Sequence, residues 1–462
     1  MKTKLKFLGV VLLVCSLGAC EKDELEIVDL DRSTSADLKA VKNLNNGMIK
    51  SYSNETVLEW NQLLSNSIDN SLPQPFEAKI YAMVTLAMHD ALNNVVPKYE
   101  TYALDNIGVD AGDISKKNIH SIADAAVSQA ARDMIVELYP DAQAAADELL
   151  NATLSRIEDS NLKTRGILIG QDAAAAMFEK RANDFPLRFE TFVGTTEPGD
   201  YQSNWPPFIN ATPMWPANAV YAPTLGDLTP FGALSGDQFR NETPNALNSA
   251  AYLADYNEVK SLGCTTCPLR TAEQTEIGAF WIESTASSMN RVARTLVAQE
   301  DLDGWEAARL IALVEMAVMD GYIASFEGKY YFNFWRPISA IRAGDMDGID
   351  QTEGDLEWTS NFTTPPTPEF PSTHAYTGAA AAQVFIEYFK KDKIDLTVTS
   401  PYNLPTAERH LSSFSQMSYE NAISRIYIGF HFRHAVEVGE KQGKELGEYI
   451  FKNNLQELKK VL

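Results

Sequence analysis

The chain has 462 residues, 45% of them hydrophobic, so it is long enough to bury a large core. Its formal net charge is -23, which argues against nucleic acid as a partner, because phosphates are bound through clustered Lys and Arg side chains. Any local cluster of cations is therefore informative, since the surrounding field repels anions.

The first 19 residues have the pattern of a bacterial lipoprotein signal peptide. A basic start, Lys2 to Lys6, precedes a mostly apolar run from Phe7 to Leu17, which is too short to span a bilayer of roughly 30 Å. The processing pattern Leu17-Gly18-Ala19-Cys20 follows, and the alternative is an ordinary secretory signal with a chance cysteine. We predict an exported lipoprotein anchored through Cys20, in the outer membrane, on its periplasmic or cell-surface side.

Residues 20–54 are polar and lack sustained periodicity, which is typical of a tether between the membrane and a folded body. The body is predicted to span 55–462. Apolar residues at helical spacing, uninterrupted by proline, predict its first helices. They cover Phe76–Asn94, Ile119–Leu138, Ala142–Ile157 and Leu162–Ala182.

Between Phe185 and Pro244 the pattern changes to Pro, Gly and aromatic residues, as in Trp205-Pro206-Pro207 and Met214-Trp215-Pro216. Such a long aperiodic stretch usually packs over a scaffold or shapes a site, and its aromatic content argues against a disordered linker. Cys264 and Cys267 follow. One pair at this spacing favours a local disulfide over a zinc site, which needs two more ligands.

Helical periodicity then resumes, and alternating strand patterns are rare. We therefore predict an all-α fold with long aromatic and proline-rich connections. The later helices are expected at Thr271–Val297, Glu306–Ala324, His374–Phe389, Tyr419–Tyr427 and Ala435–Phe451.

Lys329 and Arg336 enclose five aromatic residues and are followed by Pro337. If this stretch is helical, the spacing of seven is two turns and both cations point the same way. Pro337 would then end or redirect the helix. The pair offers a compact charge and a forked donor to an oxyanion. A solvated helix face is the alternative.

Ser372, Thr373 and His374 open an alanine-rich helix. The free backbone N–H groups of a helix N-terminus form a ready anion site, and Ser372 can also serve as the N-cap. His374 lies where a proton donor would touch the bound anion. Taken singly, Ser372 could be only a cap and His374 a satisfied core histidine.

Arg425 and His431 form a third segment, with Gly429 between them. Each also has an ordinary structural explanation when taken alone. Three cations, two histidines and one open helix N-terminus in this order are improbable by chance, however, and together they predict an oxyanion site.

The order Lys-x6-Arg-Pro, Pro-Ser-x-His and Ser-Arg-x5-His resembles the signature of the vanadium haloperoxidase and type 2 phosphatidic acid phosphatase superfamily. The aromatic run before Arg336 is closer to the haloperoxidases. Leu86–Ala91 and Ala254–Lys260 resemble segments of bacterial members. The resemblance covers most of the chain from about residue 55, with its specific motifs within 320–440, and it implies helical bundles of the vanadium haloperoxidase type.

The resemblance also implies vanadate as the cofactor, hydrogen peroxide and halide as substrates, hypohalous acid as the product, and a small organic molecule as a further candidate substrate. His431 would be the vanadium ligand. His374 would act as acid–base and Lys329 would polarise peroxide. The implied cofactor-binding residues are Lys329, Arg336, Ser372, Thr373, Arg425 and His431.

Two departures bear on this prediction. Thr373 stands where the family usually has glycine, and Ala435 stands where the phosphatases usually carry an aspartate that orients the last histidine. Ala435 weakens an acid phosphatase with His431 as nucleophile and His374 as general acid, which is the first alternative. A non-catalytic oxyanion-binding lipoprotein is the second. Thr367, where related enzymes often carry an aromatic residue or histidine, favours iodide or bromide over chloride.

Overall fold

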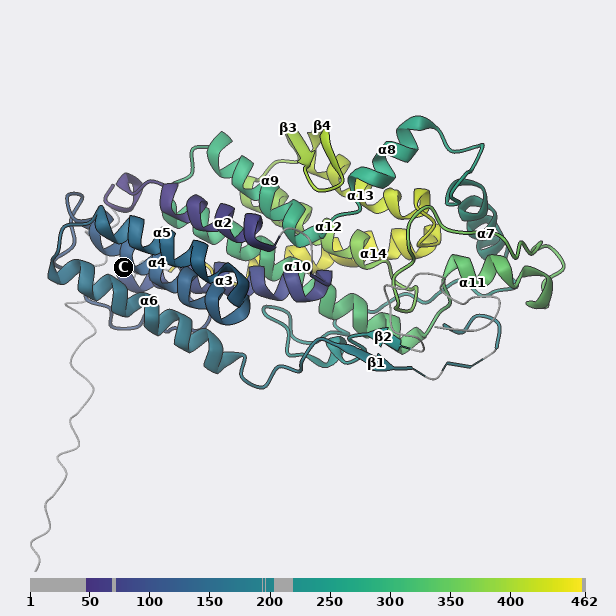
Figure 1. The fold of residues 1–462 in the computed structure, drawn as a ribbon, viewed down its shortest axis with the longest axis horizontal. Helices are drawn as coiled ribbons and strands as arrows, with labels where there is room; N and C mark the ends of the chain where they lie inside the picture. The colour runs from purple at the N-terminus through teal and green to yellow at the C-terminus, as the bar shows by residue number, and fades with distance from the viewer. Residues whose placement is uncertain (1–46, 69–71, 193, 196, 203–218, 459–462) are drawn as a thin grey trace, which may run out of the picture.

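Figure 1 shows a computed structural model of the chain, which describes residues 47–68, 72–192, 194, 195, 197–202 and 219–458. Most of these residues are helical and the strands are short, so the predicted all-α class is confirmed. The predicted signal peptide and residues 20–46 of the tether lie outside the described residues. Met48, Ile49 and Tyr52 are buried, so the end of the predicted tether packs on the body.

The amino-terminal half forms a helical bundle at one end of the molecule (Figure 1). In it, α4 packs against α3, α5 and α6, and nearly every residue of α3 is buried. The predicted helices of this region are confirmed to within two residues at either end, whereas α2 was not predicted. The bundle consists of α2 (Glu55–Ile68), α3 (Gln74–Val95), α4 (Ile119–Leu138), the 3-10 turn η2 (Pro140–Ala142), α5 (Gln143–Ser155) and α6 (Asn161–Lys180).

The second bundle is built around α10, which packs on α3 and on α12 and so joins the two bundles. α12 and α14 approach closely, because a Cβ at Gly443 would lie only 2.1 Å from the Tyr376 carbonyl oxygen. At the starts of these two helices, the Ser372 N–H donates to the Ala435 carbonyl oxygen at 3.0 Å, so they begin side by side. The bundle consists of α9 (Thr285–Gln299), α10 (Gly304–Phe332), α12 (Thr373–Phe389), α13 (Phe414–Tyr427) and α14 (Arg433–Asn453).

Smaller elements pack around the two bundles. The strands form two antiparallel hairpins, and the longer one, β3 with β4, was not predicted from the sequence. Within the described ranges, no helix combines the length and apolar character that a membrane crossing requires. These elements are η1 (Ile49–Ser51), β1 (Phe189–Thr191), β2 (Ala219–Tyr221), η3 (Leu225–Asp227), α7 (Ala250–Leu262), α8 (Ala272–Phe280), α11 (Pro337–Arg342), η4 (Gly344–Met346), β3 (Lys393–Ser400) and β4 (Leu404–Ser413).

Three predictions for the middle of the chain have different outcomes. The single helix expected over Thr271–Val297 is wrong, because α8 ends at Phe280 and α9 begins at Thr285. The disulfide between Cys264 and Cys267 is present. The aromatic motifs at 205–207 and 214–216 lie outside the described residues.

Candidate active site

Lys329 lies near the end of α10, with its ammonium group buried against a loop that precedes α12. Its Nζ donates to three backbone carbonyl oxygens, those of Pro368 at 3.1 Å, Glu369 at 2.8 Å and Pro371 at 2.7 Å. The loop can lie this close because the preceding residue is Gly328, where a Cβ would meet Pro371 Cδ at 2.8 Å. Main-chain groups therefore fix the position of this cation.

Arg336 reaches the same loop from a different element. Its Nε and Nη2 donate to the carbonyl and hydroxyl oxygens of Thr367 at 2.8 and 2.9 Å. The stretch from Lys329 to Arg336 is not one continuous helix, because α10 ends at Phe332 and Asn333 adopts a left-handed conformation with φ 49°. Arg336 is instead the N-cap of α11, which Pro337 begins. The two cations converge through a turn.

Ser372 is the N-cap of α12, as predicted, but its hydroxyl makes no capping hydrogen bond. The Ser372 Oγ is fully buried and has no hydrogen-bond partner among the described residues. A buried hydroxyl without a partner is costly, and here it stands at a helix N-terminus whose first N–H groups lack partners within the helix. This is the strongest local indication of a missing hydrogen-bonding group.

Thr373, the residue in the usual glycine position, does not obstruct this N-terminus. Its Oγ1 accepts a hydrogen bond from Ser325 Oγ of α10 at 3.0 Å, so the side-chain hydroxyl is engaged on that helix. The backbone N–H of Thr373 stays in the first turn of α12, where an anion can use it.

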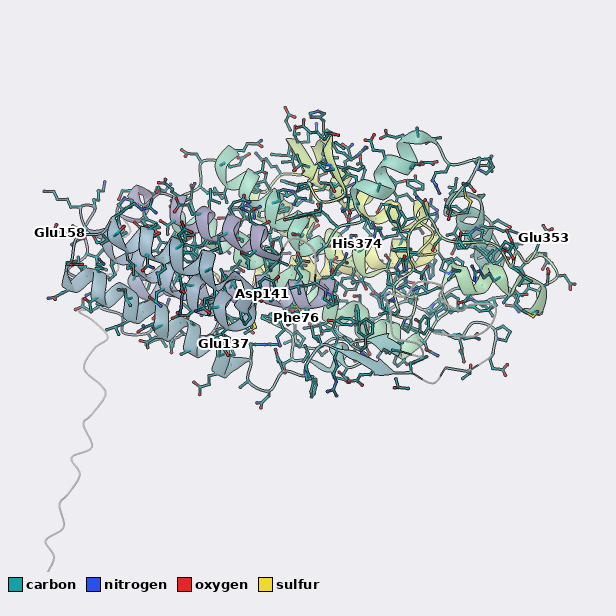
Figure 2. All side chains as sticks on the ribbon, viewed as in Figure 1. Phe76, Glu137, Asp141, Glu158, Glu353 and His374 are labelled. Carbon is teal, nitrogen blue, oxygen red and sulfur yellow. A yellow bond between two sulfur atoms is a disulfide. The ribbon has the colours of Figure 1, made fainter. Side chains whose placement is uncertain are left out.

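His374 and Arg425 meet at the break between α8 and α9. Arg425 donates from Nη2 to the carbonyl oxygen of Trp281 and from Nε to Ser424 Oγ. The buried ring of His374 makes backbone hydrogen bonds with Trp281 and Glu283, and Figure 2 shows His374 among the carboxy-terminal helices. The sequence missed this contribution, because the break contains neither glycine nor proline.

His431 is held between a carboxylate and a guanidinium group. Its Nδ1 lies 2.9 Å from Glu369 Oε1, and its Nε2 lies 2.9 Å from Arg336 Nη1. Glu369 Oε1 also accepts from the backbone N–H of Phe432 at 3.0 Å. The interpretation that Ala435 leaves this histidine without an orienting carboxylate is therefore wrong. The sequence signal was Glu369 itself, an acidic residue inside the second motif.

The electrostatics of the cluster favour an anion. Burial, reinforced by neighbouring cations, lowers the pKa of His431 and of Lys329 well below their ordinary values. Burial also lowers the pKa of Arg425 to about 9 and that of His374 well below its usual range, with Arg425 adding to the latter effect. An anion placed among these groups would oppose every one of these shifts, because an opposite charge favours the charged form of a base.

These residues fit a tetrahedral oxyanion such as vanadate. Three buried cations supply compensating charge, and the free hydroxyl of Ser372 together with the α12 N-terminus supplies hydrogen-bond donors. His431 Nε2 faces the cations, and once Nδ1 carries the proton its lone pair accepts from Arg336 Nη1, a bond that a bound oxyanion would replace. All seven predicted site residues, including Thr373 through its backbone, thus lie in or beside one buried cluster.

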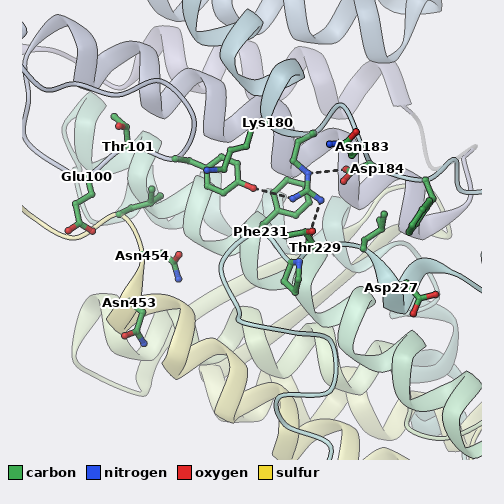
Figure 3. Close-up of a pocket in the computed structure, with 16 residues that line it drawn as sticks. Glu100, Thr101, Lys180, Asn183, Asp184, Asp227, Thr229, Phe231, Asn453 and Asn454 are labelled. Atoms are coloured by element: carbon green, nitrogen blue, oxygen red, sulfur yellow. Dashed lines mark hydrogen bonds and ion pairs between the residues drawn. The ribbon is translucent and has the colours of Figure 1, made fainter.

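A separate cavity of about 510 Å³ lies away from this cluster, near the ends of α6 and α14 (Figure 3). Its Arg181 is already held by Tyr102, Asp184 and the Thr229 carbonyl oxygen. None of the predicted site residues lines it. The cavity is therefore not part of the candidate site.

Comparison with known proteins agrees with the geometry. Residues 309–460 match the family model of the VCPO second helical-bundle domain. Over 486 residues the chain is 25% identical to vanadium chloroperoxidase of Curvularia inaequalis, covering 83% of this chain and 79% of that protein.

Solved structures show the same fold. The first bacterial vanadium-dependent iodoperoxidase aligns with a TM-score of 0.71 and 22% identity, covering 88% of this chain and 98% of that one. A bacterial vanadium-dependent chloroperoxidase in its holo form aligns with a TM-score of 0.64 and 18% identity, covering 85% and 95%. The predicted resemblance is confirmed: residues 309–460 match a helical-bundle domain of this family, and most of the chain resembles vanadium haloperoxidases in sequence and fold.

Proposed function

We propose that the protein is a vanadate-dependent haloperoxidase that uses hydrogen peroxide to oxidise iodide or bromide to hypohalous acid. The observation that carries the proposal is the unpartnered Ser372 hydroxyl at the α12 N-terminus, among three buried cations and His431. Similarity to vanadium haloperoxidases supports the same chemistry.

Each side chain has a defined task in this proposal. Lys329, Arg336 and Arg425 neutralise the oxyanion, and Ser372 and the N–H of Thr373 donate hydrogen bonds to it. Vanadate, when bound, supplies a Lewis acid that activates peroxide toward the halide. His431 presents the Nε2 lone pair. Burial lowers the pKa of His374, and the charge of a bound oxyanion opposes that shift, which allows this ring to accept and return a proton.

The halide preference rests on Thr367. Its carbonyl and hydroxyl oxygens both bind Arg336, so a small polar residue lies beside the cluster. A large, weakly hydrated halide such as iodide or bromide is therefore the proposed substrate. The fold likeness to a protein described as an iodoperoxidase supports this choice.

The test is a steady-state assay with chloride, bromide and iodide, in the presence and absence of orthovanadate. We expect peroxide-dependent oxidation of iodide and bromide only in the vanadate-loaded protein. Activity that does not need vanadate, or no activity with any halide, would refute the proposal.

One observation favours a second function, hydrolysis of phosphate esters by the metal-free protein. Glu369 orients His431 as a carboxylate must in a histidine nucleophile. The sequence argument against a phosphatase, based on Ala435, therefore loses its force. Hydrolysis of an aryl phosphate by the metal-free protein, inhibited by vanadate and lost in His431→Ala, would establish this activity.

We also propose export and lipid anchoring through Cys20. The support is the signal-like sequence of residues 1–20. Incorporation of a labelled fatty acid into the wild-type protein, and its loss in Cys20→Ala, is the expected result. Equal labelling of both proteins would contradict it.

A further inference from the structure

Glu369 touches all three site motifs. Its backbone N–H donates to the Phe334 carbonyl oxygen at 2.9 Å, and its own carbonyl oxygen accepts from Lys329 at 2.8 Å. Its carboxylate reaches His431 and Phe432. The side chain is fully buried. Hydrogen bonds therefore fix both the backbone and the carboxylate of this residue.

The contacts of His431 fix which ring nitrogen carries the proton. Arg336 has only donors, so its Nη1 can bond Nε2 at 2.9 Å only if Nε2 carries a lone pair. In a neutral imidazole the proton then resides on Nδ1, where Glu369 Oε1 accepts it at 2.9 Å. Both neighbours select the same tautomer.

This arrangement does not depend on the charge of Glu369. Burial raises the pKa of Glu369 to about 8, whereas Lys329 and Arg336 lower it. Oε1 already accepts from the Phe432 N–H, while Oε2 has no partner among the described residues. A proton on this carboxyl group would therefore reside on Oε2 and leave Oε1 as the acceptor.

The usual position for an orienting carboxylate, four residues after the histidine, carries no carboxylate in this chain, because it is Ala435. Ala435 is buried, and its carbonyl oxygen accepts from the Ser372 N–H at 3.0 Å. A small cavity of about 10 Å³ is lined by both Ala435 and Glu369. The carboxyl group thus enters the same neighbourhood from the loop before α12.

We propose that Glu369 is the positioning residue of the site, holding His431 in the Nδ1–H tautomer with Nε2 directed at the oxyanion. The inference rests on the proposed function, in which Nε2 contacts vanadate. Hydrogen bonds to the second nitrogen of a ligating histidine orient the ring, and their loss typically costs about 10- to 100-fold in affinity.

The tautomer is measured first, on the wild-type protein without vanadate. Selective ¹⁵N-histidine labelling, with His431→Gln to identify the signals, distinguishes a protonated Nδ1 from a protonated Nε2. We expect Nδ1–H. The Nε2–H tautomer in the wild-type protein would overturn the proposal, and this measurement needs no destabilising variant.

Vanadate affinity, measured by calorimetric titration, is the second readout. Glu369→Ala should bind about 10- to 100-fold more weakly, and Glu369→Gln, which keeps an acceptor oxygen, should lose less. Adding Ala435→Asp to Glu369→Ala should recover part of the affinity. Glu353→Gln is the matched control, because that side chain is exposed at the far end of the molecule (Figure 2).

The outcomes separate this inference from the proposed function. Wild-type affinity in a folded Glu369→Ala protein overturns the role of Glu369 while leaving the function intact. A wild-type protein that binds no vanadate overturns the function, and an Nε2–H tautomer would then still overturn the role of Glu369. Thermal unfolding of each variant establishes that it is folded before titration.

Discussion

His89 in the first bundle and His431 in the second are both buried, and burial lowers the pKa of both rings. His89 Nε2 lies 3.0 Å from the Glu100 carbonyl oxygen, and the adjacent Asp90 accepts three backbone N–H groups of residues 102–104. Beside His431, by contrast, Ser372 and Glu369 keep atoms without a partner among the described residues. Burial and a shifted pKa are common to both places, so neither identifies the site; the feature that does is a buried hydroxyl, without a partner among the described residues, beside three buried cations.

The largest expected contrast is between two histidine substitutions. His431→Ala should reduce vanadate-dependent halide oxidation more than about a hundredfold, because the loss of one group directed at the transition state costs about 10²–10³. His89→Gln should keep wild-type turnover at a temperature where it is folded, since its contacts are structural. The check is kcat with saturating vanadate for both variants. Equal loss of activity in the two would break the comparison.

The second prediction concerns stability in the first bundle. Asp90→Ala leaves three partly buried N–H groups without an acceptor, those of Tyr102, Ala103 and Leu104. At roughly 1–3 kcal/mol each, partly recovered by relaxation, the free energy of unfolding should fall by about 4 kcal/mol. Urea unfolding measures it, with the exposed Asp105→Ala as control. A change in vanadate affinity without a change in stability would show that Asp90 serves the site and not the stability of the first bundle.

The third prediction is a pH dependence of stability. Burial lowers the pKa of His89 from 6.5 to about 4, so between these values the unfolded chain binds a proton that the folded chain does not. Stability is therefore lost as pH falls from 6.5 to 4, by about 3 kcal/mol from this residue. His374 and His431 act in the same direction.

Urea unfolding gives the free energy of unfolding at pH 7 and at pH 4. The loss of this free energy between pH 7 and pH 4 should be smaller by about 3 kcal/mol in His89→Gln than in the wild type. An unchanged difference in the variant would show that His89 does not carry this dependence.

The smallest effect sharpens the comparison most directly, because the same change is made at two buried serines. Ser128 Oγ accepts from Trp60 Nε1 at 2.8 Å, so Ser128→Ala should lower the free energy of unfolding by about 1–2 kcal/mol. Ser372→Ala removes an unpartnered hydroxyl and should leave the stability of the metal-free protein unchanged or slightly higher, while weakening vanadate binding. Destabilisation of similar size in both variants would contradict this.

Much of the fold followed from periodicity, because long helices without internal proline repeat the same apolar spacing. Two features did not. The break between α8 and α9 carries no glycine or proline, so its carbonyl groups beside His374 and Arg425 were unpredictable. The left-handed Asn333 interrupts a stretch whose aromatic residues suit a helix equally well.

In the site, too, one part was predictable from the sequence and another was not. The motifs predicted which cations and histidines come together, because three motifs in this order are typical of one oxyanion site. Motif order does not convey which neighbour orients His431. Glu369 lies 62 residues before that histidine in sequence, and only tertiary packing brings the two side chains together.

Lys329 is bound by main-chain oxygens of Pro368, Glu369 and Pro371 rather than by side chains. A carbonyl oxygen is present whatever residue occupies its position. The Thr367 side chain can therefore change without releasing the Lys329 ammonium group, whereas the Glu369 side chain is tied to His431. The loop backbone keeps the Lys329 charge at a fixed point, while the side chains that would face a halide can change between related proteins.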